Sequence, residues 1–137
     1  MTKRETIFQG CRGHSNTIVY LHAMFYRGLV FFSGCSHFFY GLIALYHPYF
    51  ISEFIRYGFG DFRIFIGVVQ SLLGVLLLIG FFHNKLKRLA SLGLAIMMAG
   101  ALGTRIQIGD TLVQSIPAIV YLIINLSIFR TTIITKK

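Results

Sequence analysis

Three polar side chains stand inside long apolar stretches of the sequence. They are His37, Gln70 and Gln114. An imidazole and two amides can donate and accept hydrogen bonds, so together they could form a polar pocket. A polar group inside a membrane segment is costly and by default suggests a functional site. The same groups can instead join neighbouring helices by hydrogen bonds, so both interpretations stay open.

Charged residues lie at the edges of the same apolar stretches. We expect Arg63, Arg105, Asp61 and Asp110 to surround the mouth of a polar pocket, in the half of the bundle that also holds the three polar side chains. An exposed rim of ion pairs that contributes little is the alternative. The predicted ligand-binding set is therefore His37, Gln70, Gln114, Arg63, Arg105 and Asp110.

Several chemistries do not fit the sequence. Only one of the five histidines, His37, lies inside an apolar stretch, so neither a bis-histidine haem nor a metal site is expected. The four acidic residues lie outside these stretches, which counts against a proton-coupled exporter with a buried carboxylate. Cys11 and Cys35 are far apart and form no Cys-x-x-Cys motif, which counts against a thiol relay. We do not expect the chain to be an enzyme on its own.

The elements that must position these side chains are membrane-spanning helices. Of the 137 residues, 55% are hydrophobic and 12% are charged, whereas soluble domains carry about 25% charged residues. A helix needs about 20 apolar residues to cross a bilayer, and the stretches are too long for barrel strands. We expect one all-α domain, an integral membrane antiparallel four-helix bundle, with spans at about 28–46, 64–82, 89–104 and 112–129.

The distribution of Lys and Arg predicts the orientation of these spans. Only Arg56, Arg63 and Arg105, of the thirteen basic residues, fall on one side of the predicted membrane. Basic loops stay in the cytoplasm, so both termini are expected there. Residues 17–26 are then the cytoplasmic approach to the first span, and the aromatic-rich residues 49–60 form a short helix along the outer surface. The net charge of +9 suits anionic lipid headgroups better than nucleic acid, which we do not expect as a partner.

Each predicted span carries a stripe of small and polar residues at spacings of three and four. Such stripes let helices pack closely in lipid. The stripes are Gly34, His37, Gly41 and Ala44 in the first span; Gly67, Gln70, Ser71 and Gly74 in the second; Gly93, Met97, Gly100 and Thr104 in the third; and Gln114, Ala118, Tyr121 and Asn125 in the fourth. We expect these faces to form the interior of the bundle.

Several runs of sequence carry a family resemblance. They are RGL from Arg27, SGCSH from Ser33, RIFIGVVQSLLGVLLLIG from Arg63, LASLGLAIMMAGALGT from Leu89 and GDTLVQSIPA from Gly109. Together they resemble the DoxX-like family of small four-span membrane proteins, over nearly the whole chain from Tyr26 to Phe129.

The resemblance implies a bacterial inner-membrane protein. It favours an accessory subunit of a quinone-linked membrane redox complex, with a quinone contacting His37, Gln70 and Gln114. Two alternatives stay open: a non-catalytic scaffold or assembly factor, and a small transporter or sensor with an outward-facing polar pocket. In each case we expect the lipid bilayer as surroundings and a protein partner or a second copy of the chain in the membrane.

Overall fold

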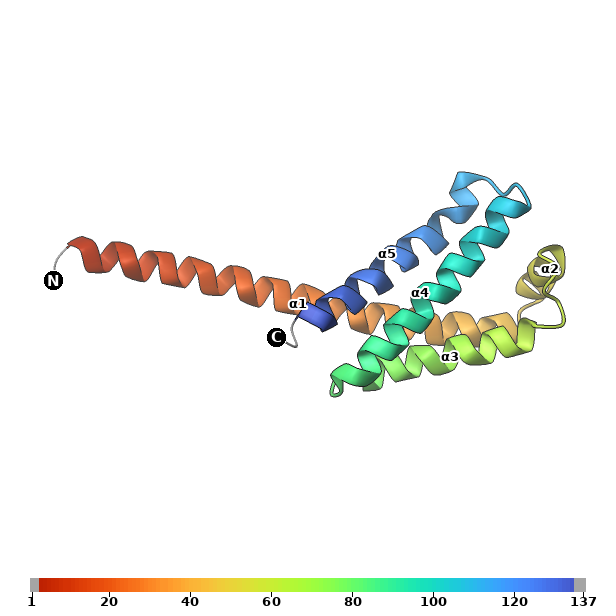
Figure 1. Ribbon diagram of the computed structural model, residues 1–137, viewed down its shortest axis with the longest axis horizontal. Coiled ribbons are helices and arrows are strands. Elements are labelled where there is room, and N and C mark those ends of the chain that lie inside the picture. The colour runs from red at the N-terminus through yellow and green to blue at the C-terminus, as the bar shows by residue number, and fades with distance from the viewer. Residues whose placement is uncertain (1–2, 135–137) are drawn as a thin grey trace.

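The computed structural model describes residues 3–134, with side chains from residue 17 onward. Within that range the chain forms five helices and no strand (Figure 1). In chain order they are α1 (Lys3–Tyr46), α2 (Pro48–Arg56), α3 (Arg63–Ile79), α4 (Asn84–Gln107) and α5 (Leu112–Ile134). The predicted all-α fold class is confirmed.

The helices have the lengths that a membrane bundle requires. Three are long and apolar enough to cross a bilayer: the Thr17–Tyr46 part of α1, then α4 and α5. Helix α3 is apolar but has only 17 residues, which is about 25 Å at 1.5 Å per residue. Backbone hydrogen bonds continue it as a turn as far as Phe82. Three long apolar helices and a shorter one agree with the expected four-span bundle.

Helix α1 begins much earlier than the predicted first span. The chain before Gly28 is part of the same helix, which projects beyond the other helices (Figure 1). Residues 17–26 contain no Gly or Pro, so nothing in them interrupts helical hydrogen bonding, and Arg27 is itself a good helix former. Their apolar side chains are exposed, with Tyr20 at 71% and Met24 at 72%.

The long helices form two antiparallel pairs, α1 with α3 and α4 with α5. The pairs meet at the end that holds the α3–α4 turn and separate toward the end that holds α2 (Figure 1). The buried apolar core lies at the closed end and takes residues from all four long helices: Val30, Leu77, Ala90, Leu94 and Ile128. We call the space between the separated ends the wedge.

Helices α1 and α3 approach each other through their predicted small-residue stripes. A Cβ atom on Gly74 would lie 2.7 Å from the backbone nitrogen of Phe38 and 2.8 Å from the carbonyl oxygen of Gly34. A Cβ on Gly41 would lie 2.5 Å from the carbonyl oxygen of Gly67. The obstructing atoms belong to backbone and cannot rotate away, so the close approach of α1 and α3 depends on glycine at these positions.

We expect Gly74→Ala to lower the stability of the folded protein by about 1–3 kcal/mol, because overpacking forces the two backbones apart. Reversible unfolding in mild detergent would measure this. Gly103→Ala is the matched control, because a Cβ on Gly103 meets nothing within 4 Å. Equal effects of the two substitutions would contradict the proposed role of the close approach.

Candidate functional site

A chain of hydrogen bonds centred on His37 joins three helices. His37 of α1 is 1% exposed. Its Nδ1 lies 3.1 Å from the side-chain amide of Gln70 on α3, and its Nε2 lies 3.0 Å from Nδ2 of Asn125 on α5. Ser33, one turn earlier on α1, donates to Oδ1 of Asn125 at 2.8 Å. The predicted meeting of His37 and Gln70 is therefore present in the structure.

The partners of His37 determine where its proton lies. Nδ2 of Asn125 donates to the carbonyl oxygen of Tyr121 at 2.8 Å, and a carbonyl can only accept, so the orientation of this amide is fixed. The second hydrogen on Nδ2 points to Nε2 of His37. Nε2 therefore accepts, and Nδ1 carries the proton of a neutral ring. The amide nitrogen of Gln70 is placed 3.1 Å from Nδ1 of His37. Two donors cannot form a hydrogen bond with each other. The Gln70 amide must therefore be oriented with its oxygen toward His37.

A cavity of about 400 Å³ lies in the wedge between α2, α3 and α4. Aromatic side chains of α2 and methionines of α4 supply apolar walls, and Gln70 reaches it from α3. Its lining is Tyr49, Phe50, Glu53, Phe54, Tyr57, Phe59, Ile66, Gln70, Met97, Met98, Gly100, Ala101, Thr104 and Arg105. Gln70 thus belongs both to the hydrogen-bond chain and to the cavity wall. With the oxygen of Gln70 turned to His37, its NH₂ group points away from His37.

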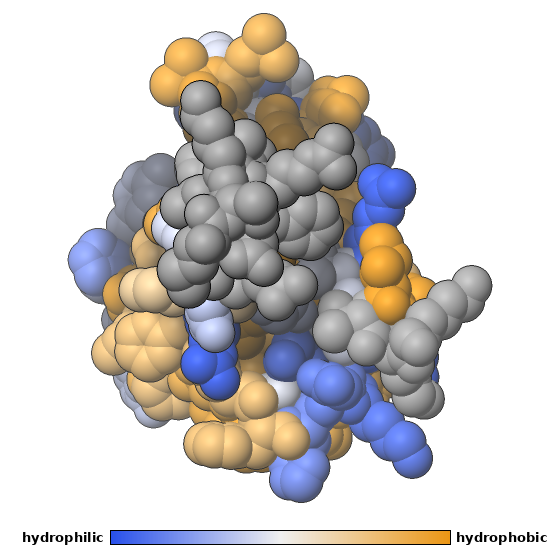
Figure 2. Space-filling model, turned by 90° about the vertical axis from the view of Figure 1, so that its left-hand side faces the viewer, coloured by the Kyte–Doolittle hydropathy of each residue, from blue (hydrophilic) through white to orange (hydrophobic). Residues whose placement is uncertain are grey.

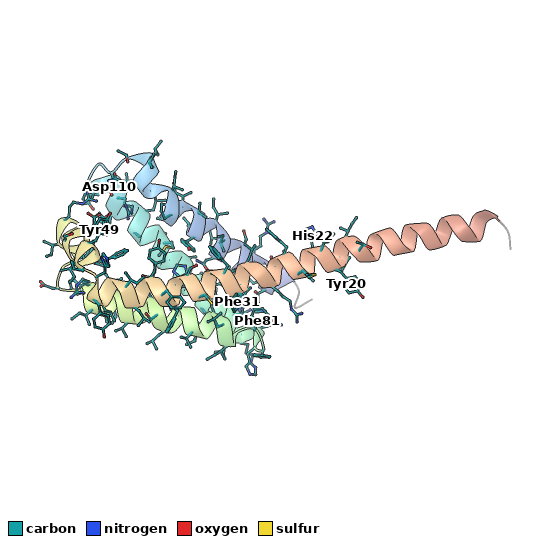
Figure 3. The ribbon with its side chains drawn as sticks, turned by 180° about the vertical axis from the view of Figure 1, so that it is seen from behind. Tyr20, His22, Phe31, Tyr49, Phe81 and Asp110 are labelled. Atoms are coloured by element: carbon teal, nitrogen blue, oxygen red, sulfur yellow. The ribbon has the colours of Figure 1, made fainter. Side chains whose placement is uncertain are left out.

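Charged residues hold the open end of the wedge together. Arg56 of α2 contacts Asp110, in the α4–α5 turn, at 2.7 Å, and Arg105 of α4 contacts the same carboxylate at 3.1 Å. Arg56 also pairs with Glu53 at 2.7 Å, and the hydroxyl of Tyr57 donates to Glu53 at 2.8 Å. We call these five residues the latch, because they tie α2 to the α4–α5 pair. Figure 3 shows Tyr49 of α2 and Asp110 at the same end of the molecule.

Two glycine-ended turns build the latch locally. Gly109 follows α4 with φ 75°, which brings the backbone N–H of Asp110 to the carbonyl oxygen of Arg105 at 2.9 Å. Gly58 follows α2 with φ 76°, and the N–H of Phe59 reaches the carbonyl oxygen of Phe54 at 2.9 Å. Such left-handed glycines are the usual way to end a helix. The first turn folds Asp110 back over the last turn of α4, where Arg105 stands.

The latch shifts the pKa values of its ionisable groups. Hydrogen bonds from Arg56 lower the pKa of Glu53 and of Asp110, whose side chain is 3% exposed. Burial, together with the hydrogen bond to Glu53, raises the pKa of Tyr57 to about 12. Its ring lies 4.8 Å from the guanidinium carbon of Arg56 and 5.3 Å from that of Arg105. The tyrosine is therefore a neutral wall of the cavity between two cations.

Of the six predicted site residues, only Gln70 and Arg105 line the cavity, and two of the others bond to helix ends instead. Gln114 is exposed, and its Oε1 accepts from the N–H and the hydroxyl of Thr111 at 2.9 Å each, which is a capping box at the start of α5. Arg63 donates to the carbonyl oxygens of Ala44 and Leu45 at 2.8 and 2.6 Å, so it caps the end of α1. Neither side chain is part of the cavity lining.

Other participants were missed as site residues. Asn125, not Gln114, is the member of the fourth-span stripe that reaches His37; the two are eleven positions apart, about 16 Å along a helix. Arg56 and Tyr57 had no marker except their place in the predicted surface helix. Asp61 forms no ion pair with the side chains of residues 17–134.

Comparison with known proteins identifies the family. The model of the DoxX-like family matches residues 28–127, which includes α1 from Gly28 onward, the hydrogen-bond chain and the latch. This chain belongs to the DoxX-like family. Comparisons with curated proteins and with solved structures give no match. The family assignment agrees with a membrane helical bundle.

We expect Ser33→Ala to lower the stability of this DoxX-like protein by about 1–3 kcal/mol, because it leaves the buried oxygen of Asn125 without its donor. Ser127→Ala is the matched control: Ser127 is exposed and bonds only to the carbonyl oxygen of Ile123 in its own helix. Denaturant unfolding in detergent gives both values. If the Ser33 variant is as stable as the Ser127 variant, the hydrogen bonds around His37 contribute little to the stability of the fold.

The latch should open in acid. The pKa values of Glu53 and Asp110 are lowered in the folded protein. The two carboxylates therefore contribute fully to the stability of the fold above their pKa values in the unfolded chain, about 4. That contribution is lost as the pH falls through their lower pKa values in the folded protein. Spin labels on Ser52 and Leu112 should move apart below about pH 4. Asp110→Asn should show the wider separation already at neutral pH, and an unchanged separation would contradict the latch.

Proposed function

We propose that this DoxX-like protein is an accessory subunit of a quinone-linked redox complex in a bacterial inner membrane, and that the wedge cavity receives the quinone ring. The observation that carries the proposal is the combination of an apolar cavity of about 400 Å³ with hydrogen-bond donors from different helices. We do not propose that the chain catalyses a reaction alone.

The lining suits the chemistry of a quinone. A quinone is a flat ring whose two carbonyl oxygens, at opposite edges, accept hydrogen bonds. The cavity offers the NH₂ group of Gln70 from α3 and the guanidinium of Arg105 from α4. Phe50, Phe54 and the methionines supply surfaces for the ring, since thioether and aromatic groups pack well against aromatic rings. A bound quinone would supply reversible electron transfer.

The other site residues act through those two donors. His37 holds the amide oxygen of Gln70, so it is a positioning residue. Asp110 pairs with Arg105 at 3.1 Å and limits where the guanidinium can point. Of the six residues predicted from sequence, two would touch the ligand and two would position them. Arg63 and Gln114 are outside the proposed site.

The arrangement of the helices supports the proposed orientation. Both described ends of the chain and the α3–α4 turn lie on the same side of the bundle (Figure 1). That side carries Lys85, Lys87, Arg88 and Arg130, and basic flanks remain in the cytoplasm. We therefore propose cytoplasmic termini, with the cavity and the latch toward the outer face.

A scaffold role is the second candidate, because α1 extends beyond the bundle with exposed apolar side chains. Ile18, Val19, Leu21 and Phe25 are all more than 45% exposed. A helical rod of this kind could contact another membrane protein without any ligand. The two functions differ in what they require of the cavity.

Quinone binding to the purified protein in lipid nanodiscs tests the proposal. Ala101 lines the cavity, so Ala101→Phe should fill part of it and weaken binding of a short-chain ubiquinone or menaquinone about tenfold or more. Ala99→Phe is the matched control, two positions away on α4, exposed and not part of the lining. If both variants bind as the wild type does, or the wild type does not bind, the cavity is not a quinone site.

A second pair of variants tests the assigned donor. Gln70→Leu should weaken quinone binding, and Gln114→Leu should not, because only Gln70 reaches the cavity. Proteins that co-purify with the wild type from native membranes would then test the accessory role. If the Ala101→Phe variant still co-purifies with oxidoreductase partners but binds no measurable quinone, the scaffold role is favoured.

A further inference from the structure

A second, smaller cavity lies at the closed end of the bundle and is lined by two cations. It measures about 190 Å³ and is bounded by Ala23, Tyr26, Arg27, Val30, Phe81 and Lys87. Figure 3 shows Phe81 at the end opposite Tyr49 and Asp110. Figure 2 looks onto the end where α1 projects, and hydrophilic side chains stand there among hydrophobic ones. This cavity is therefore separate from the wedge.

Aromatic rings and one tight backbone contact position the two cations. The guanidinium carbon of Arg27 lies 6.0 Å from the ring centre of Phe81, and the ammonium of Lys87 lies 5.6 Å from that of Tyr26. A Cβ on Gly80 would lie 2.7 Å from the backbone nitrogen of Lys87, so the end of α3 directly supports the start of α4. The rings are walls of a preformed site, since Tyr26 is itself fixed by a 2.8 Å hydrogen bond to Thr132.

No carboxylate among the described side chains neutralises this site. Within residues 17–134 the acids are Glu53, Asp61 and Asp110, all at the end of the bundle that holds α2 and the α4–α5 turn. Among the side chains that the structure describes, Lys87 donates to the neutral amide oxygen of Asn84, at 3.2 Å. Two like charges on one small cavity repel each other, and an anion bound between them would remove that repulsion.

We propose that Arg27 and Lys87 bind a phosphate-bearing anion in this cavity. A guanidinium matches phosphate oxygens in pairs, and an ammonium adds a point charge. The site lies at the edge of the apolar helices, on the side proposed to face the cytoplasm, where anionic lipid headgroups attract basic residues. The anion is thus the headgroup phosphate of an acidic lipid or a free phosphate, and both have the same chemistry. The proposal does not depend on the function proposed for the wedge.

Lipid retention measured by native mass spectrometry tests the proposal. The protein is released from nanodiscs of mixed phosphatidylglycerol and phosphatidylcholine. We expect the wild type to retain phosphatidylglycerol preferentially, and Arg27→Gln or Lys87→Gln each to reduce that retention about tenfold. Lys85→Gln removes the same charge from an exposed neighbour outside the cavity, and should retain the lipid. Thermal unfolding of each variant checks that it is folded.

The outcomes show whether the site exists and, if it does, whether its phosphate belongs to a lipid or is free. Lys87→Arg keeps the charge and should retain the lipid at the wild-type level. In phosphatidylcholine nanodiscs, inorganic phosphate is added as the only anion. If it then stabilises the wild type but not Lys87→Gln, the site is supported and its ligand is a free phosphate. If phosphatidylglycerol is retained but inorganic phosphate has no such effect, the site is supported and its ligand is a lipid. Equal retention of the two lipids with no effect of phosphate, or equal losses in Lys85→Gln and Lys87→Gln, would overturn the proposal.

Discussion

The hydrogen bonds of His37 are the constraint on which the rest of the structure depends. Helices in a bilayer gain little from burying apolar surface against one another, because lipid tails are equally apolar. Close packing and polar contacts must select the partners instead. His37 contacts Gln70 on α3 and Asn125 on α5, so one residue of α1 connects the α1–α3 pair to the α4–α5 pair.

Glycine contacts and the apolar core explain why the bundle has a closed end and an open end on either side of His37. The glycine contacts allow α1 and α3 to lie almost backbone to backbone. The core of Val30, Leu77 and Ile128 closes the bundle on one side of His37. Beyond His37 no comparable apolar cluster joins the pairs among the described residues, so they separate and leave the wedge. The latch reconnects them across it, through charges rather than apolar packing.

The hydrogen-bond chain also connects the interior to the cavity. With Asn125 held by the carbonyl of Tyr121, each successive partner has one allowed orientation, and the last of them, Gln70, must turn its NH₂ group away from His37. A residue that does not touch the cavity thereby determines which hydrogen-bonding group the cavity presents. The buried network is therefore a structural element that also fixes the orientation of one residue of the cavity lining.

The sequence by itself determined the helices, their small-residue faces and the meeting of His37 with Gln70, because apolar length and helical spacing are local properties. It did not determine which residue of α5 would meet them. Gln114 and Asn125 lie on one predicted stripe, and only the angle between the helix pairs places Asn125 at His37. Nor could it show that Arg63 caps α1 while Arg56 reaches Asp110, or that two cationic side chains line a second cavity. Those contacts join segments far apart in the chain, and their geometry exists only once the helices have packed.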